Sequence, residues 1–308
     1  KILPSVVDGK DFDVVGISVA FDDQLHAAFH CAKAVRRLLP HAHITMGGTY
    51  VTAGMAQVRE RKVFDYVDSL VVEDGEEPLA ALVREVASGR PEFRKVPSLI
   101  YREGDEICRN PVKPPIPLES LPCPDYLVFP LERYTVAKKD MGMPFRTSRG
   151  CYWGRCAYCR TGGTSFCGFE QSSAEQMFKN LLSISESTGV TYFNFADNVT
   201  DPPVLNDFSR MLFESGKQIR WTTSLRLDKS VTMERCINFR KAGCTNLTFG
   251  LETINPRLLP LIDKGISLET AQKTLSNAAW AGFLTVAFMM VGLPTETEEE
   301  ARFYNGKL

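Results

Sequence analysis

Residues 149–159 read RGCYWGRCAYC and bring three cysteines, Cys151, Cys156 and Cys159, into a segment of nine residues. A short strand predicted at Pro144–Ser148 ends directly before this cluster, so the cysteines lie on the loop at the carboxyl end of a strand. Because the loop is short, the three thiolates can converge within a few ångströms. A C-x4-C-x2-C spacing of this kind predicts a metal site.

Three interpretations of this site remain open on the residues alone. A four-iron cluster held by three cysteines keeps one iron open for a substrate or cosubstrate, whereas electron-transfer ferredoxins normally use a fourth cysteine. A closed zinc site needs a fourth ligand, and Cys167, eight residues after Cys159, is a candidate for it. In the third interpretation the cysteines are reduced and structural, without a metal.

The chain after this loop alternates predicted strands and helices over residues 141–308. Repeated βα units joined by short loops predict a barrel or partial barrel, and five strands are too few to close one. The strands are predicted at Pro144–Ser148, Thr191–Ala196, Arg220–Ser224, Asn246–Gly250 and Leu284–Val291, and the helices at Ser173–Ser187, Val204–Ser215, Thr232–Ala242, Ser267–Ala281 and from Thr297 onward.

Residues 1–90 show a similar alternation and predict a separate domain with a parallel sheet covered by helices. Three strands make only part of a doubly wound domain. Because the chain begins at Lys1 and stops soon after the fifth barrel strand, we expect it to be clipped at both ends. The strands are predicted at Asp13–Ala20, His43–Met46 and Tyr66–Val72, and the helices at Gln24–Leu39, Met55–Arg61 and Pro78–Ala87.

Residues 91–140 are predicted to connect the two domains. A small hairpin is expected at Ser98–Arg109, with its turn at Gly104-Asp105. The segment Pro111–Pro130 contains seven prolines in twenty residues, a density that excludes helix and favours an extended connector. The sequence therefore predicts an α/β protein with a domain boundary in this segment.

The composition is that of a soluble globular protein, with 44% hydrophobic and 24% charged residues. The net charge of −1 gives no general attraction to nucleic acid or to an anionic membrane. No apolar run reaches the ~18 residues of a spanning helix, and no signal peptide opens the chain. Nine cysteines with one dense cluster differ from a secreted disulfide framework, so a reducing, cytoplasmic location is expected.

The cysteine loop and the barrel pattern together resemble the radical S-adenosylmethionine (SAM) superfamily. The usual motif of that family is C-x3-C-x2-C after the first strand of a partial (β/α)6 barrel, and this sequence has one extra residue between Cys151 and Cys156. The resemblance implies a [4Fe–4S] cluster held by Cys151, Cys156 and Cys159. It also implies that Tyr158, just before the last cysteine, packs near the adenine of SAM.

Further candidate contacts for SAM follow the later strands, at the end of the barrel that carries chemistry in such folds. By the resemblance, Arg226 and Glu252 hold the ribose or the amino-acid moiety, Gly292 to Pro294 lie near the adenine, and Asp197 is also a contact. The alternatives are an ordinary ion pair between Arg226 and Glu252, a turn-capping role for Asp197, and a plain strand exit at Gly292–Pro294.

The N-terminal segment resembles the cobalamin-binding domain that precedes the barrel in one large class of these enzymes. The matching stretches are Val15–Ser18, Met46–Thr52 and Glu73–Pro78, and they end predicted strands, where open α/β sheets bind ligands. The alternative is a scaffold without a ligand, in which Gly47-Gly48 only makes a turn. The D-x-H-x-x-G motif of histidine-ligated cobalamin proteins is absent. The resemblance implies cobalamin contacts from Ser18, Gly47, Gly48, Thr49, Gly75 and Glu76.

These resemblances imply a radical SAM enzyme that generates a 5′-deoxyadenosyl radical and methylates an unactivated carbon with the help of cobalamin. One alternative is a cobalamin-associated rearrangement or oxidation without methyl transfer. Another, of a different class, is a non-catalytic iron–sulfur or zinc protein. The expected partners are a small-molecule or peptide substrate and an external electron donor such as a flavodoxin or ferredoxin.

Overall fold

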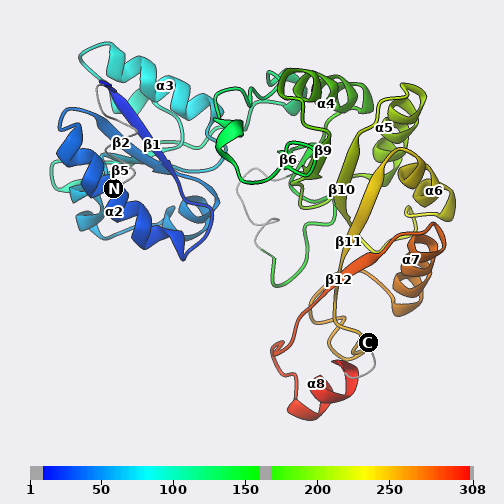
Figure 1. Ribbon diagram of the computed structural model, residues 1–308. Coiled ribbons are helices and arrows are strands. Elements are labelled where there is room, and N and C mark those ends of the chain that lie inside the picture. Colours follow the sequence, from blue (N-terminus) through cyan, green and yellow to red (C-terminus); the bar gives the residue numbers. More distant parts are fainter. Residues whose placement is uncertain (1–9, 160–167, 306–308) are drawn as a thin grey trace. The chain divides into compact units, whose positions relative to one another are not determined.

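The computed structural model describes residues 10–159 and 168–305, so Cys167 lies outside the described residues. The chain forms two compact units, Lys1–Ile116 and Pro117–Leu308 (Figure 1). The boundary falls inside the proline-rich segment. Among the described residues, each helix is too short or too polar to cross a bilayer.

The first unit is built on a five-stranded sheet with the order β1-β2-β3-β4-β5. Strands β1, β2 and β3 are parallel, whereas β4 and β5 are antiparallel and form the predicted hairpin. The hairpin thus extends the first sheet and does not belong to the predicted connector 91–140. The elements are β1 (Val14–Ser18), α2 (Gln24–Leu38), β2 (His43–Gly47), η1 (Val51–Met55), η2 (Arg61–Asp65), β3 (Ser69–Val71), α3 (Glu76–Ala87), η3 (Phe93–Lys95), β4 (Leu99–Glu103) and β5 (Glu106–Arg109).

Both faces of this sheet are buried, as in a doubly wound fold. Successive side chains of a strand point to opposite faces, and in β3 Leu70 belongs to one core while Val71 belongs to another. Helix α2 contributes Ala32 and Val35 to the first core. Helix α3 contributes the fully buried Leu82 to the second. The helices therefore cover different faces.

One predicted helix of this unit, Met55–Arg61, is wrong. The chain forms two short helical turns on either side of it, η1 and η2. The interruption lies at Glu60, which has an extended backbone and whose side chain accepts a hydrogen bond from Lys62 N at 3.1 Å. This cap starts a new helical turn and prevents one continuous helix through the segment.

The second unit contains a five-stranded parallel sheet with the order β12-β11-β10-β9-β6. Helices α4 to α7 lie along one side of it in Figure 1, the arrangement of a partial barrel. The five predicted strands and five predicted helices are present, with ends shifted by a few residues. The elements are η4 (Leu118–Ser120), η5 (Leu131–Arg133), β6 (Gly142–Phe145), β7 (Ser148–Arg149), β8 (Glu170–Gln171), α4 (Ala174–Thr188), β9 (Tyr192–Phe195), α5 (Pro202–Glu214), β10 (Arg220–Leu225), α6 (Met233–Lys241), β11 (Cys244–Glu252), α7 (Leu268–Trp280), β12 (Thr285–Met289) and α8 (Glu298–Asn305).

Local chemistry explains where these helices begin. The hydroxyl groups of Ser173, Thr232 and Ser267 accept hydrogen bonds from backbone N–H groups three residues later and cap α4, α6 and α7. Between the helices and the sheet, aromatic side chains fill the core, and the rings of Phe195 and Trp221 stack with centroids 5.2 Å apart. Burial of one such side chain contributes about 2–3 kcal/mol. The core therefore fixes the strands whose carboxyl ends carry the candidate site.

Candidate active site

A short antiparallel pair of strands, β7 and β8, connects the two ends of the cysteine loop. Strand β6 ends at Phe145, earlier than predicted, and Ser148–Arg149 then pairs antiparallel with Glu170–Gln171. The ion pair between Arg149 and Glu170, 2.9 Å long, joins the same two strands. The ends of segment 150–169 are thereby fixed next to each other.

Hydrogen bonds to Asp197 connect the segment before the cysteine loop to the end of β9. The carboxylate of Asp197 is 8% exposed and accepts hydrogen bonds from the N–H groups of Thr147 and Ser148, both at 2.8 Å. The hydroxyl of Thr147 donates to the second oxygen at 2.5 Å, and that of Thr200 donates at 3.4 Å. Burial raises the pKa of Asp197, while the hydrogen bonds act in the opposite direction. Asp197 therefore orients the strand that leads into the cysteine loop.

The three cysteines of the loop form no disulfide, and Cys151 and Cys156 are partly buried while Cys159 is exposed. Soft, accessible thiols on one loop have the donor chemistry that an iron–sulfur cluster requires. However, in residues 10–159 and 168–305 no three His, Cys, Asp or Glu side chains are gathered closely enough to hold a metal ion. The assignment of these cysteines as cluster ligands therefore stays a prediction.

A turn after β11, residues 262–265, packs against the middle of the cysteine loop. The indole of Trp153 donates a hydrogen bond to the carbonyl of Asp263 at 2.6 Å, and Ala157 N donates to the carbonyl of Ile262 at 2.9 Å. The guanidinium of Arg155 pairs with the Asp263 carboxylate at 3.2 Å. Gly265 has φ +67°, and a Cβ there would lie 2.1 Å from the Trp153 ring. Only glycine fits this contact.

Lys264, in the same turn, connects three of the predicted SAM contacts. Its ammonium group lies 3.0 Å from Glu252 Oε1 and 3.1 Å from the hydroxyl of Tyr158, and its carbonyl accepts a hydrogen bond from Arg226 at 2.5 Å. Lys264, Glu252 and Arg226 are each less than a tenth exposed. The ionic partner of Glu252 is thus Lys264, not Arg226 as one alternative supposed. Burial, and next the charge of Glu252, raise the pKa of Tyr158.

Aromatic rings cover the guanidinium of Arg226. Its carbon lies 5.0 Å from the ring centre of Trp153 and 5.8 Å from that of Tyr152. The hydroxyl of Tyr152 donates to Asp228 at 2.6 Å, and burial together with this bond raises the pKa of Tyr152. The cysteine loop therefore lies against the ends of β10 and β11 through its own aromatic residues.

Gly292 and Pro294 are exposed in the loop that follows β12, and Leu293 between them is buried in a cluster with Leu258 and Ile262. The side chain of Glu296 accepts hydrogen bonds from the N–H groups of Gly292 and Leu293, at 2.6 and 3.1 Å. Among the described residues no hydrogen bond joins Gly292 or Pro294 to Tyr158, and their role near adenine stays a prediction.

In the first unit, the predicted cobalamin contacts follow the carboxyl ends of the parallel strands. Ser18 pairs with Gly47 in the last register of β1 and β2. Gly48 has φ +106°, and a Cβ there would lie 2.6 Å from the carbonyl of Val19. The loops after β2 and β3 are joined by a hydrogen bond from Glu73 N to the hydroxyl of Thr52 at 2.8 Å. Thr49 is exposed after β2, and Gly75 and Glu76 begin α3 after β3.

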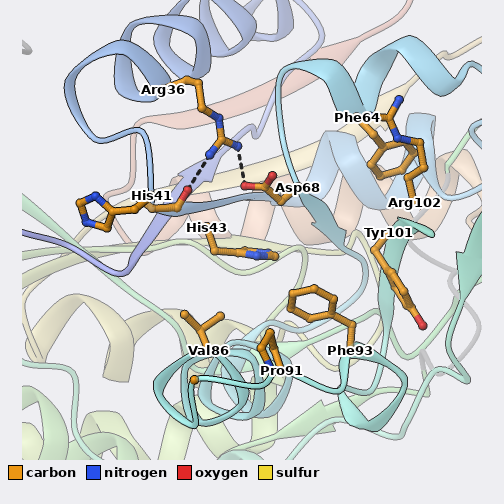
Figure 2. Close-up of a pocket in the computed structure, with 12 residues that line it drawn as sticks. Arg36, His41, His43, Phe64, Asp68, Val86, Pro91, Phe93, Tyr101 and Arg102 are labelled. Carbon is orange, nitrogen blue, oxygen red and sulfur yellow. Dashed lines mark hydrogen bonds and ion pairs between the residues drawn. The ribbon is translucent and has the colours of Figure 1, made fainter. Parts of the chain in front are cut away.

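A cavity of about 430 Å³ opens at the opposite edge of that sheet, where β2 and β3 begin (Figure 2). Figure 2 shows the guanidinium of Arg36 directed at Asp68, a contact of 2.5 Å. Below them lie His43, which bonds to Ser69 at 2.8 Å, and the ring of Phe93. Burial lowers the pKa of His43. None of the predicted cobalamin contacts lines this cavity.

Sequence reasoning missed Lys264, Asp263 and Trp153 as parts of the candidate site. A usable signal was present, because the charged pair Asp263-Lys264 stands directly before a glycine in the otherwise apolar stretch Leu258–Ile266. Charged side chains inside such a stretch need partners when the stretch packs.

The described fold and loop agree with comparisons to known proteins. The family model of the Radical SAM superfamily matches residues 145–305, which is more than half of the chain. The protein therefore belongs to the radical SAM superfamily.

Relatives and solved structures extend this likeness to both units. The chain is 27% identical over 307 residues to an uncharacterized methyltransferase of Pyrococcus horikoshii, which covers 97% of this chain and 64% of that protein. It is 23% identical over 298 residues to the anaerobic magnesium-protoporphyrin IX monomethyl ester cyclase of Cereibacter sphaeroides. This match covers 93% of this chain and 47% of the cyclase. The chain thus spans less than two-thirds of the length of these curated relatives.

Among solved structures, the radical SAM methyltransferase TsrM from Kitasatospora setae, with cobalamin and a [4Fe–4S] cluster bound, matches with a TM-score of 0.79. The identity is 18%, and the match covers 99% of this chain and 63% of that one. The shared architecture confirms the predicted fold class, an α/β protein with a partial doubly wound sheet followed by a partial radical SAM barrel.

Proposed function

We propose that the protein is a cobalamin-dependent radical SAM methyltransferase that acts on an unactivated carbon. The observation that carries this proposal is the arrangement of the cysteine loop. Its three cysteines follow the first barrel strand, and Tyr158 within it touches the buried group around Lys264. In this proposal Cys151, Cys156 and Cys159 hold the cluster.

Each part of the candidate site has a defined task in this proposal. When bound, the reduced cluster supplies the electron that cleaves SAM, and methylcobalamin supplies the methyl group. Glu252, which is 9% exposed, offers a negative charge for the ammonium end of a zwitterionic amino-acid group. Trp153 covers Arg226 and excludes water from it, and Asp197 fixes the base of the loop.

Cobalamin contacts in this proposal come from the first unit, at Ser18, Gly47, Gly48, Thr49, Gly75 and Glu76. Support comes from the loops after β1, β2 and β3, which meet at the carboxyl edge of the sheet. Open α/β sheets bind ligands at this edge. Glycine at position 48 lets the loop after β2 approach the backbone of Val19 closely, which brings the loops after β1 and β2 together at this edge.

Cobalamin retention and product analysis test this proposal. After anaerobic reconstitution of the full-length protein, we expect about one cobalamin and about four irons per chain. With methyl-labelled SAM and candidate substrates, we expect a labelled product by mass spectrometry. If the protein retains iron but no cobalamin, the proposal of methyl transfer is wrong, and radical chemistry without methyl transfer remains.

A second candidate is a radical oxidation or rearrangement without methyl transfer. The likeness to an anaerobic magnesium-protoporphyrin IX monomethyl ester cyclase favours it. The same product analysis separates the two, because this reaction yields 5′-deoxyadenosine and a changed substrate without label. A non-catalytic iron–sulfur or zinc protein would yield no 5′-deoxyadenosine, and stoichiometric zinc without iron would identify its zinc form.

We also propose a cytoplasmic protein that takes a small-molecule or peptide substrate and receives electrons from a flavodoxin or ferredoxin. The absence of disulfides among the described cysteines supports a reducing environment.

A further inference from the structure

We propose that Lys264 is a positioning residue for SAM, which acts by holding Glu252 and Tyr158 in place beside the cysteine loop. This inference rests on the proposed function and adds to it a residue outside the predicted contacts. It starts from the turn 262–265, which contacts the cysteine loop through Trp153, Arg155 and Ala157.

The ion pair of Lys264 is more buried than a surface ion pair. The side chains of Lys264 and Glu252 are 9% and 11% exposed, with Nζ and Oε1 3.0 Å apart. A buried ion pair contributes little net stability compared with a well-packed apolar pair, because desolvation offsets the attraction. The presence of this ion pair is therefore better explained by the positioning of Glu252 than by a contribution to the free energy of unfolding.

The ion pair occupies the space directly beside the backbone of Gly250. Gly250, on the same strand as Glu252, presents no side chain, and a Cβ there would lie 2.4 Å from Glu252 Oε1 and 2.8 Å from Lys264 Nζ. The backbone of Lys264 is fixed as well, since Arg226 donates to its carbonyl. The ammonium group therefore lies at a defined point over the carboxyl end of β11.

The third contact of Lys264 reaches the predicted cluster ligands. The hydroxyl of Tyr158 lies 3.1 Å from Nζ, and Tyr158 stands between Cys156 and Cys159 in the sequence. One side chain thus connects the cysteine loop with Glu252. Its loss removes the alignment of both groups and leaves the carboxylate without its cation.

Binding of SAM to the reconstituted full-length protein tests this inference. The variants are Lys264→Met, which keeps length without charge, Lys264→Arg, which keeps the charge, and Lys273→Met as a control on the exposed face of α7. Iron content is measured first. The change in the electron paramagnetic resonance spectrum of the reduced cluster is then followed as SAM is added.

We expect Lys264→Met to retain iron but to bind SAM at least about tenfold more weakly, the effect of one lost charge-assisted hydrogen bond. Lys264→Arg should recover most of the affinity, and Lys273→Met should equal the wild type. Wild-type affinity in Lys264→Met, or equal weakening in Lys264→Arg, would overturn the inference.

Two further outcomes are decisive. A wild-type protein that loads no cluster or binds no SAM overturns the proposed function together with this inference, whereas normal binding in Lys264→Met overturns the inference alone. If Lys264→Met does not load a cluster, Tyr158→Phe takes its place, because it removes one contact of Lys264 and leaves the ion pair. Weaker binding of SAM with normal iron content supports the inference, and unchanged binding overturns it.

Discussion

Gly48 shows how strongly one position constrains the first unit. Its left-handed φ of +106° and the 2.6 Å gap between a Cβ and the carbonyl of Val19 exclude any side chain. Gly75, another predicted cobalamin contact, has φ −89° and nothing within 4 Å of a Cβ. The backbone at Gly48 therefore requires glycine, whereas the backbone at Gly75 accepts a side chain, although both glycines are predicted cobalamin contacts.

We predict that Gly48→Ala destabilises the first unit by about 3 kcal/mol, since strain and a backbone clash add. Gly75→Ala should change stability by less than about 1 kcal/mol. Native-state hydrogen exchange of the β2 amides measures both, because the two units need not unfold together. Equal protection in the two variants would contradict the assigned geometry.

The turn 262–265 contacts the cysteine loop through Trp153, Arg155 and Ala157. Its fit depends on Gly265, whose φ is +67° and which lies against Trp153. Gly282 has a similar φ of +84° but nothing within 4 Å of a Cβ. A comparison of alanine at these two positions isolates the contact with Trp153, since backbone strain is common to both.

We predict that Gly265→Ala displaces Trp153 and lowers the iron loaded per chain by at least about half, because a Cβ 2.1 Å from the ring cannot be accommodated. Gly282→Ala should load iron as the wild type does. Tryptophan emission reports the displacement when both variants are made in a Trp280→Phe background, which removes the exposed indole near Gly282. Identical emission and iron content in the two variants would refute the packing of turn and loop.

The elements of the barrel were predictable because their signals are local. Apolar periodicity located the five strands, and Ser173, Thr232 and Ser267 marked helix starts. The helix expected at Met55–Arg61 failed because a side-chain cap at Glu60 overrides a weak pattern.

The candidate site was less predictable, since its contacts join distant parts of the chain. Tyr158 and Lys264 are 106 positions apart, and Thr147 and Asp197 are 50 apart. The sequence indicated Arg226 and Glu252 as neighbours, yet the residue that joins them is Lys264. Pairing of this kind depends on strand order and turn geometry, which local patterns do not encode.

The two units share one principle, although they are described separately. In each, the candidate binding residues follow the carboxyl ends of parallel strands, Ser18 and Gly48 in the first unit and Tyr158 and Glu252 in the second. The shared architecture with radical SAM enzymes of known structure spans both units. Each unit therefore has one predicted binding site at the carboxyl ends of its parallel strands. The site in the first unit is predicted to bind cobalamin, and the site in the second unit the cluster and SAM.

Formation of 5′-deoxyadenosine tests the central assignment, the cleavage of SAM at a cluster held by the three cysteines. The full-length protein, reconstituted with iron and sulfide and reduced with dithionite, is incubated with SAM and analysed by mass spectrometry. We predict 5′-deoxyadenosine from the wild type and none above background from Cys156→Ala, with Cys236→Ala, a buried cysteine of α6, as the matched control. Equal amounts from the wild type and Cys156→Ala, or none from a wild type that contains zinc and no iron, would contradict the account.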